Sequence, residues 1–317
     1  MFIRLLLATL EFKRNSNSLK MYSPYLELAK QDKRPKKYYG KVIIYSIAFW
    51  LVFLVAIMFT SEFFQLSSEL DQIPSIEEIP YPMNVYHLRT FIGLFLGVIF
   101  LFIFPNIHDR KIITLINTSN SIRYKSIIYA FGIWFILYGI IYIIGFLSDP
   151  SKYHLESSII DWLSIELLLL IINRIIGIII VGFIVAYILQ GISLIISNPL
   201  YLFLTLSIFS GLTNISSTEY YNWIQSFILG FYLTFFRLWL IYKDDGIEVL
   251  LGIGLVNSLY SPIIIQPDGE LVFTDFNPLF TNTPALSLTT NLIITLVQSL
   301  IFYLIYFRVT RQRSKAN

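Results

Sequence analysis

Residues 126–148 read SIIYAFGIWFILYGIIYIIGFLS, twenty-three consecutive positions without a charged side chain. A helix that crosses the hydrocarbon core of a bilayer needs about 20 predominantly apolar residues. The stretch Ser126–Ser148 therefore predicts a membrane-spanning helix. The composition of the whole chain agrees, because 56% of its 317 residues are hydrophobic and only 14% are charged, whereas soluble domains carry about 25% charged residues.

Seven further apolar stretches lie on either side of this segment. They are Val42–Thr60, Leu88–Phe104, Asp161–Gln190, Pro199–Gly211 with an extension to about Ser217, Tyr221–Phe236, Val249–Ile265 and Leu286–Phe307. The sequence thus predicts an all-α polytopic membrane protein with about eight transmembrane helices. We expect one membrane domain at residues 42–310, with a basic segment at 1–41 before it and a basic tail at 311–317 after it.

The positions of the charges provide a test of this count, because Lys and Arg concentrate in the cytoplasmic loops of membrane proteins. With eight spans, 20 of the 23 Lys and Arg residues fall on one side of the membrane. The opposite loops carry acidic residues, which are Glu62, Glu69, Asp71, Glu77, Glu78, Asp268, Glu270 and Asp275. We therefore predict a multi-pass membrane protein with both termini on the cytoplasmic side, or on the equivalent stromal side.

The basic residues near the amino terminus indicate a lipid surface as a partner. A cluster such as Lys30–Lys41 is expected beside a span on the cytoplasmic face, where each Lys or Arg near anionic lipid contributes about 1 kcal/mol of attraction. We accordingly expect the lipid bilayer as a partner and no nucleic acid. The apolar stretch Leu5–Leu10 is too short for a signal peptide, so this segment either forms an interfacial amphipathic helix or precedes a true start at Met21.

The residue types needed for most catalytic sites are scarce in this chain. It has no cysteine, and its three histidines, His87, His108 and His154, lie outside the predicted spans. No two of them are spaced as in a zinc-binding helix, and no phosphate-binding loop or nucleophile elbow occurs. The residues therefore predict no catalytic constellation, no metal site and no cofactor.

One charged residue, Arg174, lies well inside a predicted span. Ionisable groups within the bilayer are costly and usually face the interior of a bundle, so each is a candidate for function. Glu166 lies eight residues earlier, about 12 Å along the helix and on another face, so the two residues do not pair directly. Arg174 either finds a polar partner on another helix or takes part in binding or transport.

The carboxyl-terminal half also carries a family pattern. The run DDGIEVLLGIGLVNSLYS at Asp244–Ser261 resembles the last motif of the CPBP family, also called ABI, the CAAX-protease and bacteriocin-processing intramembrane metalloproteases. The runs YILQG at Tyr187–Gly191, IFSGLTNISSTE at Ile208–Glu219 and NPLFTNTPAL at Asn277–Leu286 are similar to other parts of the family pattern. The resemblance covers about residues 161–310 and implies a CPBP-like helical bundle.

Members of this family hydrolyse peptides with two glutamates, two histidines and an asparagine around a zinc ion or an activated water. In the frame of the resemblance, the glutamate positions hold Val185 and Ala186, and the arginine position after them holds Gln190. The histidine positions hold Asn214 and Gly254. Valine, alanine and glycine side chains cannot bind zinc or take up a proton, so the resemblance implies a site without its chemistry.

The asparagine position of the family holds Ser258, so every metal-directed side chain is replaced. The resemblance then implies a catalytically inactive relative that binds a membrane protein partner as an assembly or regulatory subunit. The polar residues either line a remnant cavity or pack against one another, and they are Gln190, Asn214, Asn257 and Ser258. Two other functions stay open, an active endopeptidase with non-standard residues and a small-solute transporter that uses Arg174.

Overall fold

The computed structural model of the protein describes residues 24–31, 40, 111–119, 121–155, 165–215, 223–267, 280–282 and 288–314. The first two predicted spans, Val42–Thr60 and Leu88–Phe104, lie outside these ranges, and so do His87 and His108. The fold described below therefore concerns six of the eight predicted spans.

Each of these six predicted spans contains a helix. The helices are α5 (Tyr124–Ser148), α6 (Ile165–Ser193), α7 (Pro199–Ile215), α8 (Trp223–Asp244), α9 (Glu248–Ile263) and α10 (Leu288–Ser314). Within the described ranges, α5, α6, α8 and α10 are long and apolar enough to cross a membrane, whereas α7 and α9 have only 17 and 16 residues. The protein is thus helical with several candidate membrane spans, and the number eight remains a prediction.

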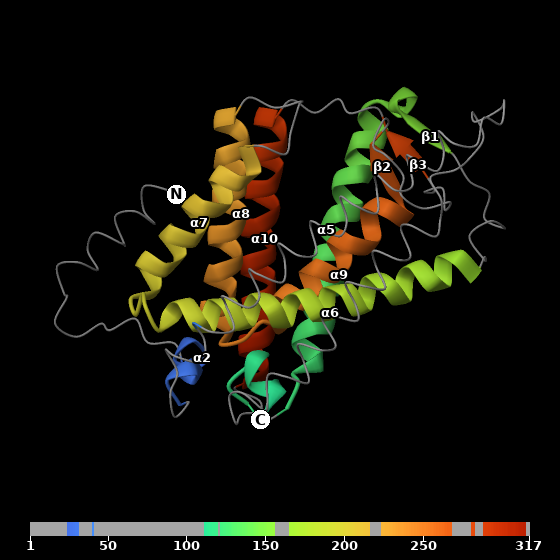
Figure 1. The fold of residues 1–317 in the computed structure, drawn as a ribbon. Helices are drawn as coiled ribbons and strands as arrows, with labels where there is room; N and C mark the ends of the chain where they lie inside the picture. Colours follow the sequence, from blue (N-terminus) through green and yellow to red (C-terminus); the bar gives the residue numbers. More distant parts are fainter. Residues whose placement is uncertain are drawn as a thin grey trace, which may run out of the picture.

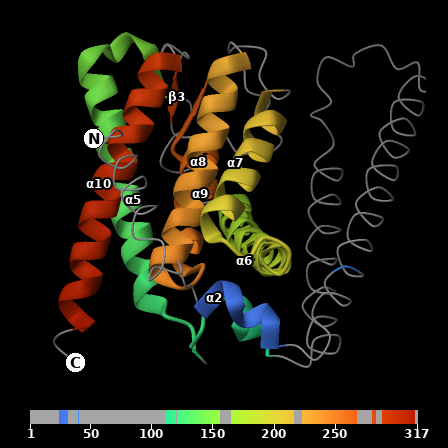
Figure 2. The same cartoon turned by 90° about the vertical axis from the view of Figure 1, so that its left-hand side faces the viewer.

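Two helix pairs make up much of the bundle. α7 packs along α8 and α5 packs along α9, while α10 contacts both α5 and α8 (Figure 1). α6 runs across these helices, and Figure 2 shows α6 nearly end-on while α5, α8 and α10 run lengthwise. The predicted fourth span is therefore a helix, but it is not one more parallel member of the bundle. α6 has 29 residues and is about 44 Å long, which is enough to cross a bilayer. If it does so, it is strongly tilted relative to α8 and α10.

The carboxyl-terminal end of α8 lies eight residues beyond the predicted end. The predicted span Tyr221–Phe236 stops before Arg237, whereas α8 continues to Asp244 and so contains Arg237. Three of the four residues 238–241 are buried and apolar, which explains why the helix continues past the charge. The helix stops where Asp245 adopts a left-handed backbone with φ 55°. Arg237, which the predicted span left just outside its end, is therefore a charge within a candidate span.

Shorter elements connect these helices. They are α2 (Pro24–Glu27), the 3-10 helices η1 (Leu28–Gln31), η3 (Ile112–Leu115) and η4 (Pro150–Lys152), and the strands β1 (Tyr153–Leu155), β2 (Ile265–Pro267) and β3 (Phe280–Asn282). β3 pairs antiparallel with β1 and parallel with β2, and His154 lies opposite Thr281 in this sheet. The all-α prediction did not include the sheet, because three-residue strands are too short to show an alternating pattern.

Part of the predicted basic segment 1–41 joins the hydrophobic core. Tyr25 and Ala29 are fully buried and Leu26 and Leu28 nearly so, in one cluster with residues of α6, α7, α8 and α9. The Tyr25 hydroxyl donates a hydrogen bond to the Leu115 main-chain oxygen at 2.7 Å. These contacts hold α2 and η1 against the bundle, where the buried apolar area stabilises the fold.

Candidate functional site

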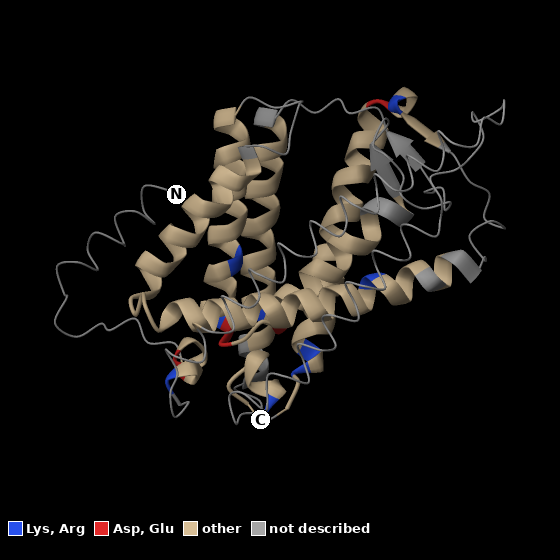
Figure 3. Ribbon diagram, viewed as in Figure 1, with Lys and Arg blue, Asp and Glu red and all other residues tan. Residues whose placement is uncertain are grey.

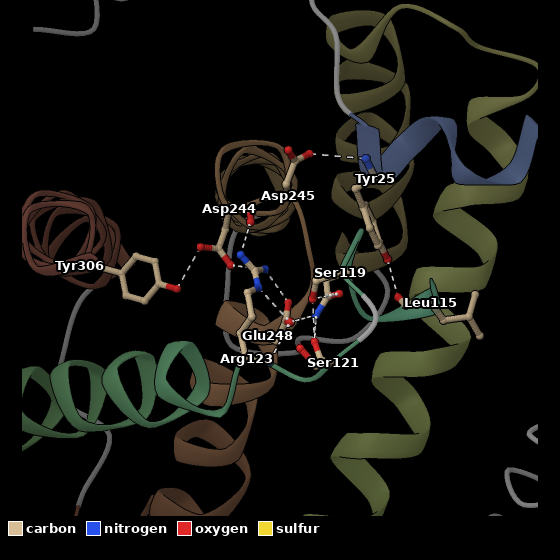
Figure 4. Close-up of polar contacts among 10 residues, drawn as sticks. Tyr25, Leu115, Ser119, Ser121, Arg123, Asp244, Asp245, Glu248 and Tyr306 are labelled. Atoms are coloured by element: carbon tan, nitrogen blue, oxygen red, sulfur yellow. Dashed lines mark hydrogen bonds and ion pairs between the residues drawn. The ribbon is translucent and has the colours of Figure 1, made fainter. Parts of the chain in front are cut away.

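Charged residues gather at the end of the bundle where α5 and α9 begin and α8 ends (Figure 3). We call the central part of this group the Arg123 junction (Figure 4). It consists of Asn117, Arg123, Asp244, Glu248 and Tyr306. Arg123 directly precedes α5, Asp244 is the last residue of α8, and Glu248 is the first residue of α9. Three segments therefore each supply one charge to the junction.

Arg123 donates hydrogen bonds to both carboxylates. Its Nε lies 3.0 Å from Glu248 Oε1 and its Nη2 lies 2.6 Å from Glu248 Oε2, so the two side chains form a bidentate pair. Nη2 also lies 2.9 Å from Asp244 Oδ2, and Nη1 lies 2.7 Å from the Asp244 main-chain oxygen. Bidentate ionic hydrogen bonds are strong and fix the relative orientation of the two groups. The guanidinium thereby ties the start of α5 to the turn between α8 and α9.

The two carboxylates have further donors on their other sides. Glu248 is fully buried, and the Asn117 side-chain amide donates to its Oε1. The Tyr306 hydroxyl donates to Asp244 Oδ1 at 3.1 Å. A buried carboxylate without partners would be strongly destabilising, so these contacts make the burial of both acids possible.

Arg123 stays positively charged at this junction. Burial lowers the pKa of its guanidinium. The hydrogen bond to Glu248 and the negative charges of Asp244 and Glu248 together raise this pKa by more than burial lowers it, so the pKa lies above its ordinary value. An arginine is protonated at every pH at which proteins fold, and this shift reinforces that state. The guanidinium therefore binds and orients the two carboxylates and does not exchange protons itself.

Sequence reasoning did not select this junction. Asp244 and Glu248 stand four residues apart, a spacing that could have suggested that the two acids lie close together. Their partner Arg123 lies 121 and 125 residues away in the chain and carries no local signal of the pairing. Gly246 is required between them, because a Cβ there would lie 2.5 Å from Arg123 Nη2 and 2.8 Å from Asn117 Cβ.

The positions that the resemblance matches to catalytic residues on α6 and α9 have different surroundings. Val185 is exposed, whereas Ala186 is fully buried in the core. Gln190 is also buried, and its Nε2 donates to the Thr114 main-chain oxygen at 2.9 Å. A Cβ at Gly254 would lie 3.3 Å from a methyl group of Ile178, so α9 approaches α6 closely there.

The remaining residues of the predicted remnant cavity contact separate neighbours. Asn214 Nδ2 donates to the Ser226 main-chain oxygen of α8 at 2.9 Å. Asn257 Oδ1 accepts a hydrogen bond from Trp134 Nε1 of α5 at 2.8 Å. The Ser258 hydroxyl donates to a main-chain oxygen of its own helix at 3.2 Å. The hydrogen bonds of the four predicted cavity residues thus lead to η3, α8, α5 and α9.

The two positions matched to the family's histidines lie at different levels of the bundle. Asn214 contacts α8 at Ser226, eighteen residues or about 27 Å before the end of that helix. Gly254 lies six residues or about 9 Å after the start of α9, which begins just beyond the end of α8. Zinc holds nitrogen ligands at about 2.0–2.1 Å, so side chains at these positions do not meet at one metal ion in this arrangement.

A small hollow occurs next to α2, and the hydroxyl of Ser193 in its lining donates to the main-chain oxygen of Gln190 at 2.6 Å. Its lining consists of Leu26, Glu27, Lys30, Ser193, Ile196, Ser197 and Pro199. Within this lining, Lys30 Nζ pairs with Glu27 Oε1 at 2.6 Å, and both side chains are exposed. An exposed ion pair of this kind contributes little to stability or binding.

Arg174 lies inside α6, as predicted, and its side chain is partly buried. Its Nε is buried without a hydrogen-bond partner among the described residues. Glu166 lies in the first turn of α6, eight residues before Arg174. The first of the two alternatives for Arg174, a polar partner on another helix, is therefore not seen in the part of the chain that the structure describes.

Comparison with known proteins adds no relative to these observations, since no protein-family model, no curated protein and no solved structure matches the chain.

Proposed function

We propose that this chain is a catalytically inactive, CPBP-like membrane protein that binds another membrane protein as an assembly or regulatory subunit. The observation that carries the proposal is which residues occupy the two positions matched to the family's histidines and what these residues contact. Asn214 Nδ2 donates a hydrogen bond to the Ser226 main-chain oxygen of α8, and Gly254 packs against Ile178 of α6. Gly254 has no side chain that could bind a metal, and the two positions contact different helices, which supports a site without the family's chemistry.

Peptide hydrolysis by the family mechanism needs more than one such group. A catalytic zinc takes three protein ligands and an open position, and its water needs a general base. Ala186 is buried in the core, and Gln190 donates to a main-chain oxygen, so these two matched positions serve packing and hydrogen bonding. The residues therefore support a role in which the fold is used without the hydrolytic reaction.

The outer surface of α5 supports a role in binding within the membrane. Ile136, Ile143 and Leu147 are 60%, 59% and 73% exposed, and most of α5 is apolar. In a bilayer such a surface contacts lipid or the helix of another protein, and close packing between helices provides the attraction. The Arg123 junction holds the start of α5 in place and would give this surface a constant position relative to α8 and α9.

The proposal is tested with the full chain purified in mild detergent from its native membrane. We expect no zinc in the protein and no cleavage of CAAX-type or leader peptides after reconstitution, with an active CPBP peptidase treated in parallel as a positive control. We also expect a stoichiometric membrane protein that is cross-linked by a photoreactive residue at Ile143 but not by one at Tyr201, an exposed residue of α7.

Two results would contradict the proposal. One zinc per chain that is lost on substitution of Asn214 would indicate a working metal site. Cleavage of either peptide class by the purified chain would establish the alternative, an endopeptidase with non-standard residues.

Solute transport is a second candidate because Arg174 has a buried Nε without a hydrogen-bond partner among the described residues. Intramembrane arginines with this property can bind anionic solutes along a transport path. Flux of a solute into liposomes that contain the purified chain, abolished by Arg174→Leu, would support this function. Flux that survives the substitution would remove its rationale.

A further inference from the structure

Arg237 is an intramembrane cation of a different kind from Arg123. It lies seven residues before the end of α8, or about 10 Å inside the helix that is a candidate span. Its side chain is exposed. Phe236, the preceding residue of α8, contacts Phe302 of α10 with ring centroids 6.5 Å apart, so Arg237 lies next to the contact between α8 and α10.

None of the ion pairs among the described residues includes Arg237. Arg123, by contrast, binds two carboxylates at 2.6 and 2.9 Å. A charged side chain within the bilayer is costly unless a polar group compensates it. The position of Arg237 is therefore one at which an added negative charge would be stabilised.

A polar side chain of α5 also lies in this region of the bundle. Tyr138 of α5 lies within electrostatic range of Arg237 of α8. Tyr138 also contacts Trp134, one turn earlier on α5, with ring centroids 5.8 Å apart. Trp134 in turn meets Phe302 of α10 edge to face at 5.2 Å.

These ring contacts place a third polar side chain, that of Gln298, at the same height along the bundle as Tyr138. α5 and α10 are antiparallel, because Tyr306 of α10 lies at the junction where α5 begins and Phe302 lies one turn further from it. Gln298 precedes Phe302 by four residues, and Tyr138 follows Trp134 by four, so both lie about 6 Å further from the junction. Gln298 is only 7% exposed, and its Nε2 has no hydrogen-bond partner among the described residues.

We propose that Arg237, Tyr138 and Gln298 form a binding site for one oxyanion, a carboxylate or phosphate group, between α5, α8 and α10. The guanidinium supplies the charge and two parallel N–H donors that match the two oxygens of such a group. The Tyr138 hydroxyl and the Gln298 amide supply neutral donors. The bound anion would satisfy the buried Gln298 Nε2 and neutralise Arg237, which are otherwise both unfavourable in an apolar bundle.

The oxyanion can belong to a free solute or to the headgroup of an anionic lipid. Binding is therefore measured with two probes on the full chain. Inorganic phosphate is titrated into the protein in a neutral detergent, and phosphatidylglycerol is added to phosphatidylcholine nanodiscs that contain the protein. Thermal stabilisation and native mass spectrometry report binding in both arms. Saturation by phosphate indicates a free anion, and retention of phosphatidylglycerol alone indicates a lipid headgroup.

The variants assign the binding to particular side chains. We expect Arg237→Gln to weaken binding at least tenfold, and Gln298→Leu and Tyr138→Phe to weaken it about threefold each, as the loss of an ionic and of a neutral hydrogen bond implies. Lys243→Gln is the matched control, because Lys243 is an exposed cation on the same helix, over the ring of Trp239. This control should bind like the unchanged protein.

Arg237→Leu distinguishes loss of binding from loss of folding. Because Arg237 has no ion pair among the described residues, this variant should melt at the same or a higher temperature without anion and should no longer respond to it. The proposal is overturned if neither probe binds or if Arg237→Gln binds as well as the unchanged protein. A cross-link from a photoreactive residue at position 237 to another membrane protein would also overturn it, in favour of a partner's carboxylate.

Discussion

Glu248 is a fully buried carboxylate whose hydrogen-bond donors, Arg123 and Asn117, lie in the segment before α5. Loss of one charge from a buried ion pair leaves the other charge uncompensated and typically costs about 3–5 kcal/mol. We therefore expect Glu248→Gln to lower the free energy of unfolding by about 3 kcal/mol, because Asp244 still compensates part of the Arg123 charge. Unfolding of the purified protein by titration with sodium dodecyl sulfate measures this change.

Glu27→Gln is the matched control for this prediction. Glu27 also forms an ion pair, with Lys30 at 2.6 Å, but the two side chains are 40% and 48% exposed. Such exposed pairs contribute about 0–1 kcal/mol, so this variant should unfold almost like the unchanged protein. Equal effects of the two substitutions would show that the Arg123 junction does not stabilise the fold through its buried charges.

At the residue scale, the sequence identified Arg174 as an intramembrane charge and missed Arg237. The difference arises from how a span is recognised, since an apolar stretch was ended at the first charge that followed it. Arg237 is followed by more buried apolar residues, and the helix continues through it to Asp244. The polar residues Gln190 and Asn214 were identified as candidates, but their hydrogen-bond partners, Thr114 and Ser226, could not be inferred from the chain.

At the scale of the elements, α5 and α9 approach each other closely at a glycine of α9. A Cβ at Gly252 would lie 2.5 Å from the Ile127 main-chain oxygen, 2.7 Å from Ala130 Cβ and 2.8 Å from the Phe131 main-chain nitrogen. Two of these atoms belong to the backbone and cannot rotate away. We expect Gly252→Ala to lower the free energy of unfolding by about 1–3 kcal/mol, the usual cost of overpacking, in the same detergent titration.

Gly177→Ala serves as the control for the Gly252 substitution. Gly177 is also inside a helix, α6, but a Cβ there has no neighbour within 4 Å. Since alanine favours the helix over glycine by up to about 1 kcal/mol, this variant should be as stable as the unchanged protein or slightly more stable. A loss of stability equal to that of Gly252→Ala would contradict the close approach of α5 and α9.

Small residues on α8 explain why α7 and α8 pack together. Ser226, Gly230 and Thr234 recur at every fourth position on α8, and a Cβ at Gly230 would lie 2.8 Å from Asn214 Cβ of α7. Small side chains at such spacing let two helices approach closely within a membrane. Hydrogen bonds then cross the interface, and the Thr234 hydroxyl donates to Ser210 Oγ at 2.7 Å.

This interface can be tested by cross-linking, because the chain has no natural cysteine. The double variant Ser210→Cys, Thr234→Cys should form a disulfide on mild oxidation, since the two side-chain oxygens lie 2.7 Å apart. Phe209→Cys with Thr234→Cys is the control, because Phe209 is 65% exposed on another face of α7. Non-reducing electrophoresis after cleavage of the loop between α7 and α8 distinguishes the two, and equal yields would contradict the packing.

At the scale of the whole molecule, the charge distribution predicts which end of the bundle faces the cytoplasm. Lys111, Arg123, Lys125 and Lys243 lie near the end where α5 begins, whereas Lys152 lies beyond the other end of α5. We therefore expect Lys111→Cys to be labelled by a membrane-impermeant maleimide only from the cytoplasmic side. Ser151→Cys, exposed after α5, should be labelled only from the opposite side. Labelling of both from one side would show that α5 does not cross the membrane.

The sequence by itself determined the helical class, the candidate membrane spans and the approximate positions of the six described helices. These properties depend on quantities that accumulate along the chain, because a span requires about 20 consecutive apolar residues and tolerates few charges. The charge-free stretch Ser126–Ser148, for example, corresponds closely to α5, Tyr124–Ser148. The same local information indicated that the positions matched to family ligands lack metal-binding side chains, since only the residue types are needed for that inference.

Only the tertiary structure decided how these helices are arranged and which polar residues meet. α6 crosses the bundle, Arg123 joins Asp244 and Glu248 across more than 120 residues of chain, and Tyr138 and Gln298 are brought to the level of Arg237. None of these relations has a periodic signal in the sequence, because each results from packing between segments that are far apart along the chain. Their free energies come from shape complementarity and from the compensation of buried charge, which exist only when the folded partners are in contact.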